Sequence, residues 1–317
     1  MGVSICSLFE NNKDADAVTV YIIDDGIDKE NKDKLSELAR VYSRELIFLT
    51  GDILLEDEEL VRTFEYTRFR KNTHSYFKMF IDRLVPDLDE RMIYIDCDTA
   101  VEGDISELVS LDMDGKPIGM VQDSLITSLK TEIGIDDKDR YYNSGVILID
   151  LKRWKELECS RRIFEHIRDV RTYGTVDQDV LNVELHDEIV TLPVRYNLQP
   201  IHMVYSYRQY SRVYVHNEPY YTEEEIKEAL DKPGIFHFLR YIGESPWHEN
   251  NVHPDTPYFD KYLAISPWKD MVRKPSGRGG IFKVEKLMYK IFPKPVFLRI
   301  FYIVHDRMIK KSSKVEK

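Results

Sequence analysis

The sequence predicts an α/β fold with a ligand site beyond the carboxyl ends of its strands. First, short apolar runs of strand length alternate with segments of helical periodicity. Second, the 317 residues can bury one large core, and 43% hydrophobic with 32% charged residues is typical of a soluble globular protein. Third, no apolar run reaches the roughly 18 residues of a membrane-spanning helix, and the first residues lack the pattern of an export signal.

The predicted elements follow one another in a regular order. Residues 18–23 (VTVYII) form the first strand, and Asp28 can cap a helix whose apolar side chains recur at helical spacing within residues 35–39. Residues 45–49 predict a second strand, and residues 76–84 predict a helix. The remaining predicted strands cover residues 92–95, 118–121, 146–149, 189–192 and 235–238.

Charge divides the chain into two parts. The net charge is −11, yet residues 271–317 contain 13 Lys and Arg against 3 Asp and Glu, a net +10, which leaves −21 on residues 1–270. So acidic a body argues against nucleic acid as its partner, because phosphate contact requires a basic face. We expect a body of residues 1–270 and a basic amphipathic helical tail of residues 271–317, joined through KPSGRGG (274–280).

The three cysteines bear on the compartment. Cys6, Cys97 and Cys159 are odd in number and widely spaced, which argues against a disulfide framework. A reducing compartment, the cytoplasm, is therefore expected.

The segment RMIYIDCDTAVEGDISEL (91–108) predicts a metal site. Its apolar strand ends in Asp96 and Asp98, and residues i and i+2 of an extended chain project to the same side. Two carboxylates beside a ligand suit Mg²⁺ or Mn²⁺, particularly where diphosphate oxygens complete the shell. The alternative is a strand that simply ends in solvated acids.

A second chemistry also uses an Asp-x-Asp after an apolar strand. Phosphatases of the haloacid dehalogenase type use the first Asp as a nucleophile, usually near the amino terminus, and place Thr or Val four residues after it. Here that position holds Ala100, which argues against this alternative.

Four later segments, in this order and spacing, carry a resemblance to a known family. They are YYNSGVILIDLKRW (141–154), VDQDVLN (176–182), LPVRYN (192–197) and GIFHF…SPW (234–247). Together with the Asp-x-Asp they resemble the family 8 glycosyltransferases, retaining enzymes of the GT-A fold that include lipopolysaccharide galactosyl- and glucosyltransferases. The resemblance runs from about residue 5 to about residue 270, and it implies that residues 1–270 are the glycosyltransferase domain.

The resemblance implies roles for individual residues. Asp96, Asp98 and His237 match the metal ligands, and an imidazole beside carboxylates favours Mn²⁺ over Mg²⁺. The family's catalytic residues near the transferred sugar match Asp123, Asp177 and Gln178. Its substrate-binding positions match Lys78, Asn143, Ser144 and Arg240. Taken alone, His237 could equally be a satisfied histidine at a strand end, and Asp177 a helix N-cap.

Some positions depart from the family. Lys78 stands where the family has Arg, and Ser245 stands where a phosphate-binding Lys precedes Pro-Trp, so Arg240 is the candidate substitute. Family members also open with a strand and an Asp-containing loop that hold uridine, whereas Met1 falls where the family is already in its first helix. We expect that first strand to be absent.

The implied function is transfer of a hexose from a UDP-sugar to a saccharide or lipid-linked glycan acceptor, with a divalent metal, in cell-surface polysaccharide synthesis. The alternative is a non-catalytic GT-A-fold protein that binds sugar or nucleotide and has lost its nucleotide-binding strand.

The basic tail contains two amphipathic segments, residues 281–292 and 296–311, separated near Pro293. Apolar residues opposite lysines suit a helix that lies on an anionic membrane surface, which would make the protein peripheral at the inner face of the membrane. The alternative is a helix pair packed on the acidic body.

Overall fold

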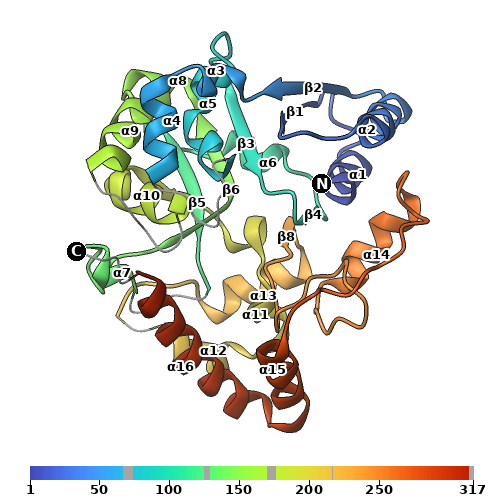
Figure 1. Cartoon of the computed structure of the whole chain (residues 1–317), viewed down its shortest axis with the longest axis vertical. Coiled ribbons are helices and arrows are strands. Elements are labelled where there is room, and N and C mark those ends of the chain that lie inside the picture. Colours follow the sequence, from blue (N-terminus) through green and yellow to red (C-terminus); the bar gives the residue numbers. More distant parts are fainter. Residues whose placement is uncertain (67–73, 125–128, 170–175, 216, 314–317) are drawn as a thin grey trace.

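The computed structural model describes residues 1–66, 74–124, 129–169, 176–215 and 217–313. Its centre is a mixed sheet with strand order β3-β6-β5-β7, which Figure 1 shows between two groups of helices. β6 is antiparallel to both β3 and β5, and β5 is parallel to β7. The bounds are β3 (Arg91–Ile95), β5 (Ile118–Gln122), β6 (Tyr142–Asp150) and β7 (Ile189–Thr191). The α/β prediction is confirmed, and each of these strands overlaps a predicted one.

The amino-terminal segment forms a small sheet of its own. α1 (Gly2–Asn11) is the first element, and β1 (Thr19–Asp24) pairs in parallel with β2 (Glu45–Thr50). Asp28 caps α2 (Lys29–Val41) as predicted, because its side chain accepts a hydrogen bond from the backbone N–H of Asn31. Within the described residues no strand precedes α1, and β1 and β2 pair only with each other.

One group of helices covers a face of the central sheet (Figure 1). Trp154, Phe77 and Phe80 lie at its core, each almost fully buried. Burial of a side chain of this size stabilises the fold by about 1.5–3 kcal/mol. The helices are α3 (Asp52–Leu55), α4 (Glu58–Tyr66), η1 (His74–Phe80), α5 (Ile81–Leu84), α8 (Leu151–Glu156), α9 (Cys159–Asp169) and α10 (Val176–Glu184).

The helix predicted over residues 76–84 is divided in two. A 3₁₀ helix, η1, runs to Phe80, where φ is −120° and ψ is 31°, and only residues 81–84 are α-helical. All side chains from Tyr76 to Ile81 are buried, so the segment has no solvent face of the kind that the helical pattern implied.

A second group of elements lies beyond the other face of the sheet. Its core includes Phe236, Tyr210 and Tyr262, and β4 (Thr99–Val101) pairs there with β8 (Ile235–His237) in the antiparallel direction. The sequence predicted β8 but not β4. The remaining elements of the body are α6 (Ser106–Ser110), α7 (Leu129–Glu132), η2 (His186–Glu188), η3 (Val194–Asn197), α11 (Pro200–Val204), α12 (Tyr207–Tyr214), α13 (Glu223–Asp231) and α14 (Thr256–Ile265).

The tail forms α15 (Gly280–Ile291) and α16 (Lys294–Ser313), and the break between them falls at Pro293 as predicted. α16 is anchored by Phe297 and Leu298, each 2% exposed, and by an edge-to-face contact between Tyr302 and Tyr214. In the part of the chain that the structure describes, no helix combines the length and apolar character needed to cross a membrane. A separate unit at residues 271–317 stays a prediction.

Candidate active site

Asp96 and Asp98 lie in the short connection between β3 and β4. The backbone N–H of Asp96 donates to the carbonyl of Gly145 on β6, and the carbonyl of Asp98 accepts from the N–H of Phe238, which follows β8. Both aspartates are therefore held by backbone bonds to strands distant in sequence. Their side chains remain 31% and 36% exposed, so they are open to a ligand.

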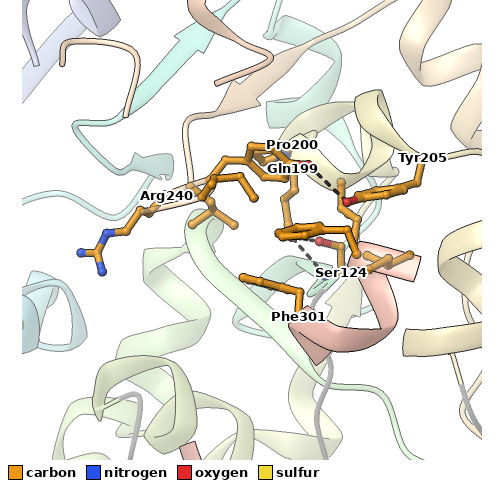
Figure 2. Close-up of a pocket in the computed structure, with 12 residues that line it drawn as sticks. Ser124, Gln199, Pro200, Tyr205, Arg240 and Phe301 are labelled. Atoms are coloured by element: carbon orange, nitrogen blue, oxygen red, sulfur yellow. Dashed lines mark hydrogen bonds between the residues drawn. The ribbon is translucent and has the colours of Figure 1, made fainter. Parts of the chain in front are cut away.

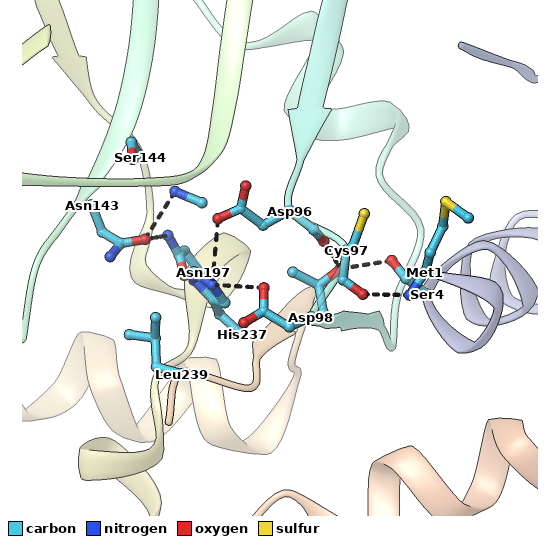
Figure 3. A network of polar contacts seen from close by, with 12 residues as sticks. Met1, Ser4, Asp96, Cys97, Asp98, Asn143, Ser144, Asn197, His237 and Leu239 are labelled. Atoms are coloured by element: carbon cyan, nitrogen blue, oxygen red, sulfur yellow. Dashed lines mark hydrogen bonds and ion pairs between the residues drawn. The ribbon is translucent and has the colours of Figure 1, made fainter. Parts of the chain in front are cut away.

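His237 joins this pair through the β4–β8 ladder. Thr99 lies opposite His237 in the antiparallel register, which places the imidazole beside Asp98. His237 Nε2 lies 3.4 Å from Asp98 Oδ1 and 3.8 Å from Asp96 Oδ2 (Figure 3). One possible ligand atom of each residue lies within 4.8 Å of the others. The structure thus brings together the three residues predicted as metal ligands.

The ring of His237 fits its place because Gly145 has no side chain. A Cβ at residue 145 would overlap the Cε1 atom of the imidazole, and any larger residue would displace the ring. Gly145 is the third residue of the Asn-Ser-Gly segment. That segment is part of β6, which therefore begins before the predicted strand of residues 146–149, and its pairing with β5 shifts register between Met120 and Val121.

Asn197, which was not among the predicted site residues, orients the imidazole. Its Oδ1 lies 3.0 Å from His237 Nδ1, and an amide oxygen can only accept, so Nδ1 carries the hydrogen. Nε2 is then the ring nitrogen that faces the two aspartates. Asn197 Nδ2 donates to Asn143 Oδ1 at 2.9 Å, so the same side chain connects the metal group to the neighbouring polar cluster. Asn197 ends LPVRYN, and that motif was the available signal.

We expect Asn197→Leu to weaken Mn²⁺ binding by about 10- to 100-fold, because the imidazole loses the partner that sets its tautomer and orientation. The measurement is the free Mn²⁺ signal in electron paramagnetic resonance. Asn12→Leu is the matched control, since Asn12 is also buried but bonds to Leu8 and Ile105, remote from this group. Equal loss of Mn²⁺ affinity in both variants would contradict the role of Asn197.

The charges of Asp96, Asp98 and His237 shift one another's pKa values. Burial alone would raise the pKa of Asp98, but the adjacent His237 outweighs it and lowers that pKa to about 2. Burial would lower the pKa of His237, but Asp98 and Asp96 raise it instead. For Asp96 burial prevails over Lys78 and His237, and its pKa is raised. Titratable groups with perturbed pKa values gathered in one cluster are typical of a functional site.

A second polar cluster adjoins the metal group. Asp123 Oδ2 accepts hydrogen bonds from Asn143 Nδ2 at 3.1 Å and from Gln178 Nε2 at 2.9 Å, and Asn143 Nδ2 also donates to Gln178 Oε1. These side chains come from the end of β5, from β6 and from the first turn of α10. The family resemblance implied that Asp123 and Gln178 lie near the transferred sugar and that Asn143 binds substrate, and the structure brings the three residues into one cluster.

Lys78 links the two clusters. Its ammonium lies 2.5 Å from Asp177 Oδ2 and 3.7 Å from Asp96 Oδ1, and it donates to the carbonyl of Ser144 at 3.0 Å. Ser144 Oγ donates to Asp177 Oδ2 at 2.9 Å. Burial would lower the pKa of Lys78, but Asp177 and Asp96 outweigh it and raise that pKa, so the buried side chain stays charged. Asp177 lies within the first turn of α10 and not before it, so its carboxylate serves this network.

Arg240 lies apart from both clusters. It is exposed and lines an apolar cavity between β8 and α16, and Figure 2 shows its guanidinium directed away from that cavity. Its charge acts on Glu285 of α15: burial raises the pKa of this carboxyl, while Arg278 and Arg240 oppose the shift. Of the ten predicted site residues, Arg240 is thus the one that the structure places toward the tail.

The fold is the GT-A fold of glycosyltransferases, as two solved structures show. The galactosyltransferase LgtC, solved with donor and acceptor sugar analogues, superimposes with a TM-score of 0.65 and 19% identity, over 86% of this chain and 95% of that chain. The bifunctional glycosyltransferase WbbM superimposes with a TM-score of 0.66 and 18% identity, over 85% of this chain and 48% of that chain. At such identities the likeness shows the fold alone.

The family follows from the sequence match. The family model described as "Glycosyl transferase family 8" matches residues 1–251, and the chain belongs to this family. The expected resemblance is confirmed, and the protein is a glycosyltransferase.

Three curated relatives match most of this chain. General stress protein A of Bacillus subtilis is 28% identical over 272 residues, 84% of this chain and 90% of that protein. A lipopolysaccharide 1,2-glucosyltransferase of Escherichia coli is 26% identical over 315 residues, 97% of this chain and 86% of that protein. A lipopolysaccharide 1,3-galactosyltransferase of Salmonella typhimurium is 26% identical over 276 residues, 84% of this chain and 74% of that protein.

Proposed function

We propose that this protein is a metal-dependent, retaining hexosyltransferase that moves a hexose from a UDP-sugar to a saccharide or lipid-linked glycan in cell-surface polysaccharide synthesis. The observation that carries the proposal is that the Asp96–Asp98–His237 group adjoins the cluster of Asp123, Asn143 and Gln178. Similarity to enzymes named lipopolysaccharide glucosyl- and galactosyltransferases supports this class of substrate.

The residues present fit a divalent cation. Asp96, Asp98 and His237 would hold it, and an imidazole nitrogen beside two carboxylates favours Mn²⁺ over Mg²⁺. When bound, the ion supplies positive charge that opposes the negative charge on a departing diphosphate. Tyr94 supports this set, because its hydroxyl donates to Asp96 Oδ1 at 2.6 Å and orients the carboxylate.

The neighbouring cluster would bind the sugar and stabilise the charge that develops on it. Cleavage of a glycosyl–diphosphate bond leaves positive charge at the anomeric carbon, and the oxygens of Asp123, Asp177 and Gln178 can face it. Their geometry is set before any ligand arrives by the bonds from Asn143 and Ser144. Such prior organisation means that the protein need not reorient its dipoles during the reaction.

We assign to Lys78 the positioning of Asp96 and Asp177, because its ammonium contacts both carboxylates and is shielded from solvent. Loss of this cation would leave carboxylates of both clusters close together without a neutralising charge. A direct bond from Lys78 to a substrate would have to replace one of these contacts.

The test is calorimetric titration of UDP into the full chain with and without Mn²⁺. We expect binding that requires Mn²⁺, followed by release of UDP from one UDP-hexose in a donor screen. Binding of equal strength in both conditions would overturn the metal dependence. No binding in either condition would overturn the UDP-sugar donor and favour the non-catalytic alternative.

A carrier lipid on the acceptor would place the reaction at a membrane. We therefore infer a cytoplasmic protein that works at the inner face of the membrane. The balance of +10 on residues 271–317 against −21 on the body is the feature of this chain that supports the inference.

A further inference from the structure

Helix α15 carries its aliphatic side chains on the face turned away from the protein. Ile281, Val284, Leu287 and Ile291 recur at spacings of three and four residues, so they share one side of the helix. Their exposed fractions lie between 55% and 66%. Single exposed aliphatic residues need no explanation, whereas a continuous row on one helix marks an interaction surface.

The opposite face attaches α15 to the body and fixes its direction. Lys286 Nζ donates to Glu244 Oε2 at 2.8 Å. The ring of Tyr289 meets Tyr241 edge to face, with 5.6 Å between centroids, and Phe297 of α16 in the same way at 5.3 Å. The polar and aromatic face of the helix thus packs on the protein and leaves the aliphatic face outside. Figure 1 shows α15 and α16 at the end of the molecule remote from β1 and β2.

Basic side chains border the aliphatic row. Lys283 and Lys290 of α15 are exposed, and so is Lys294 at the start of α16. They belong to the segment with a net charge of +10. An occupant of this face must therefore accept aliphatic side chains and also supply negative charge. The surface of an anionic bilayer offers both. A second copy of the same face would bring further positive charge, which disfavours self-association.

We propose that the outer face of α15 docks onto an anionic lipid bilayer, with the helix parallel to the surface and Ile281, Val284, Leu287 and Ile291 in the acyl boundary. The proposal deepens the proposed function, because it names the surface at which a lipid-linked acceptor would be met. The docking itself does not depend on catalysis, so the two can fail separately.

The experiment is cosedimentation of the full chain with vesicles of phosphatidylcholine alone, or with about 30 mol% phosphatidylglycerol. We expect binding to the anionic vesicles at least about tenfold stronger than to the neutral ones, and weakened at about 0.5 M NaCl. Val284→Glu combined with Leu287→Glu should reduce the bound fraction by about tenfold or more, because two carboxylates then lie in the row. Val41→Glu is the matched control, since Val41 is 65% exposed on α2 and should not affect binding.

Thermal unfolding of the same preparations checks that the variants are folded, and UDP binding separates the two proposals. Vesicle binding that does not depend on phosphatidylglycerol, or that survives the double substitution, overturns the docking. A dimer in sedimentation equilibrium that Leu287→Glu dissociates would assign the face to a second copy and would also overturn it. Normal vesicle binding without UDP binding supports the docking and counts only against the proposed function.

Discussion

Asp98→Ala should abolish Mn²⁺-dependent UDP binding and lower turnover by about 10³-fold or more. Asp98 is the aspartate nearest His237 Nε2, at 3.4 Å, and its pKa of about 2 keeps it ionised at any pH suitable for assay. Its removal leaves one carboxylate and one imidazole, too few ligands to hold a divalent ion firmly. Calorimetry of UDP with Mn²⁺, together with UDP release from the donor, measures both effects.

Glu37→Ala is the control for the loss of a negative charge. Glu37 lies on the outer face of α2, where its side chain is 63% exposed and meets only Arg40 at 4.0 Å in the described part of the chain. This variant should keep wild-type UDP binding and turnover. Asp98→Ala with full activity at saturating Mn²⁺ would show that the metal assignment is wrong.

Asp123→Ala should give the complementary result. We expect turnover to fall by about 10²–10³-fold while Mn²⁺-dependent UDP binding stays unchanged, because Asp123 belongs to the cluster proposed to face the sugar and not to the metal group. The amide N–H groups of Asn143 and Gln178 lose their shared acceptor, so the free energy of unfolding should also fall by roughly 1–3 kcal/mol. Turnover, UDP titration and thermal unfolding of one preparation separate these effects.

Asp82→Ala separates lost stability from lost catalysis. Asp82 of α5 is partly buried and accepts a hydrogen bond from Ser160 of α9. Both helices belong to the group that packs around Trp154, Phe77 and Phe80. Its removal should lower the unfolding temperature with little change in turnover. A loss of UDP binding in Asp123→Ala equal to that in Asp98→Ala would contradict the division of the site into a metal group and a sugar cluster.

The metal site shows which ligands a local sequence pattern can predict and which it cannot. The apolar run before Asp96 and Asp98 predicts a strand that ends in two carboxylates on one side, because strand alternation is a local property. His237 was predicted as a metal ligand only because it matches the family's motif, since no spacing along the chain relates it to the aspartates. The contact exists because β4 pairs with β8, and β4 is too short for its sequence to be distinguished from a loop.

The contacts of Asn197 and Lys78 also could not be predicted from the sequence. Asn197 ends a motif that was noticed, yet its bonds to His237 and Asn143 depend on three segments meeting in the core. Lys78 was expected to contact substrate, whereas the structure places its ammonium between Asp177 and Asp96. A buried cation takes the anionic partners that the fold brings nearest, and sequence distance carries no information about them.

The sequence by itself determined the α/β class, most of the strands, the Asp-x-Asp at the end of β3, and the basic character of residues 271–317. These features depend on local periodicity and composition, which can be read from the sequence without knowledge of the tertiary structure. Only the tertiary structure decided that His237 lies beside Asp98, that Asn197 orients it, and that the aliphatic face of α15 points outward. The physical reason is that contacts between residues distant in the chain set the strand register and decide which face of a helix packs on the body. On α15, Tyr289 and Lys286 contact the body, and the aliphatic row is left exposed.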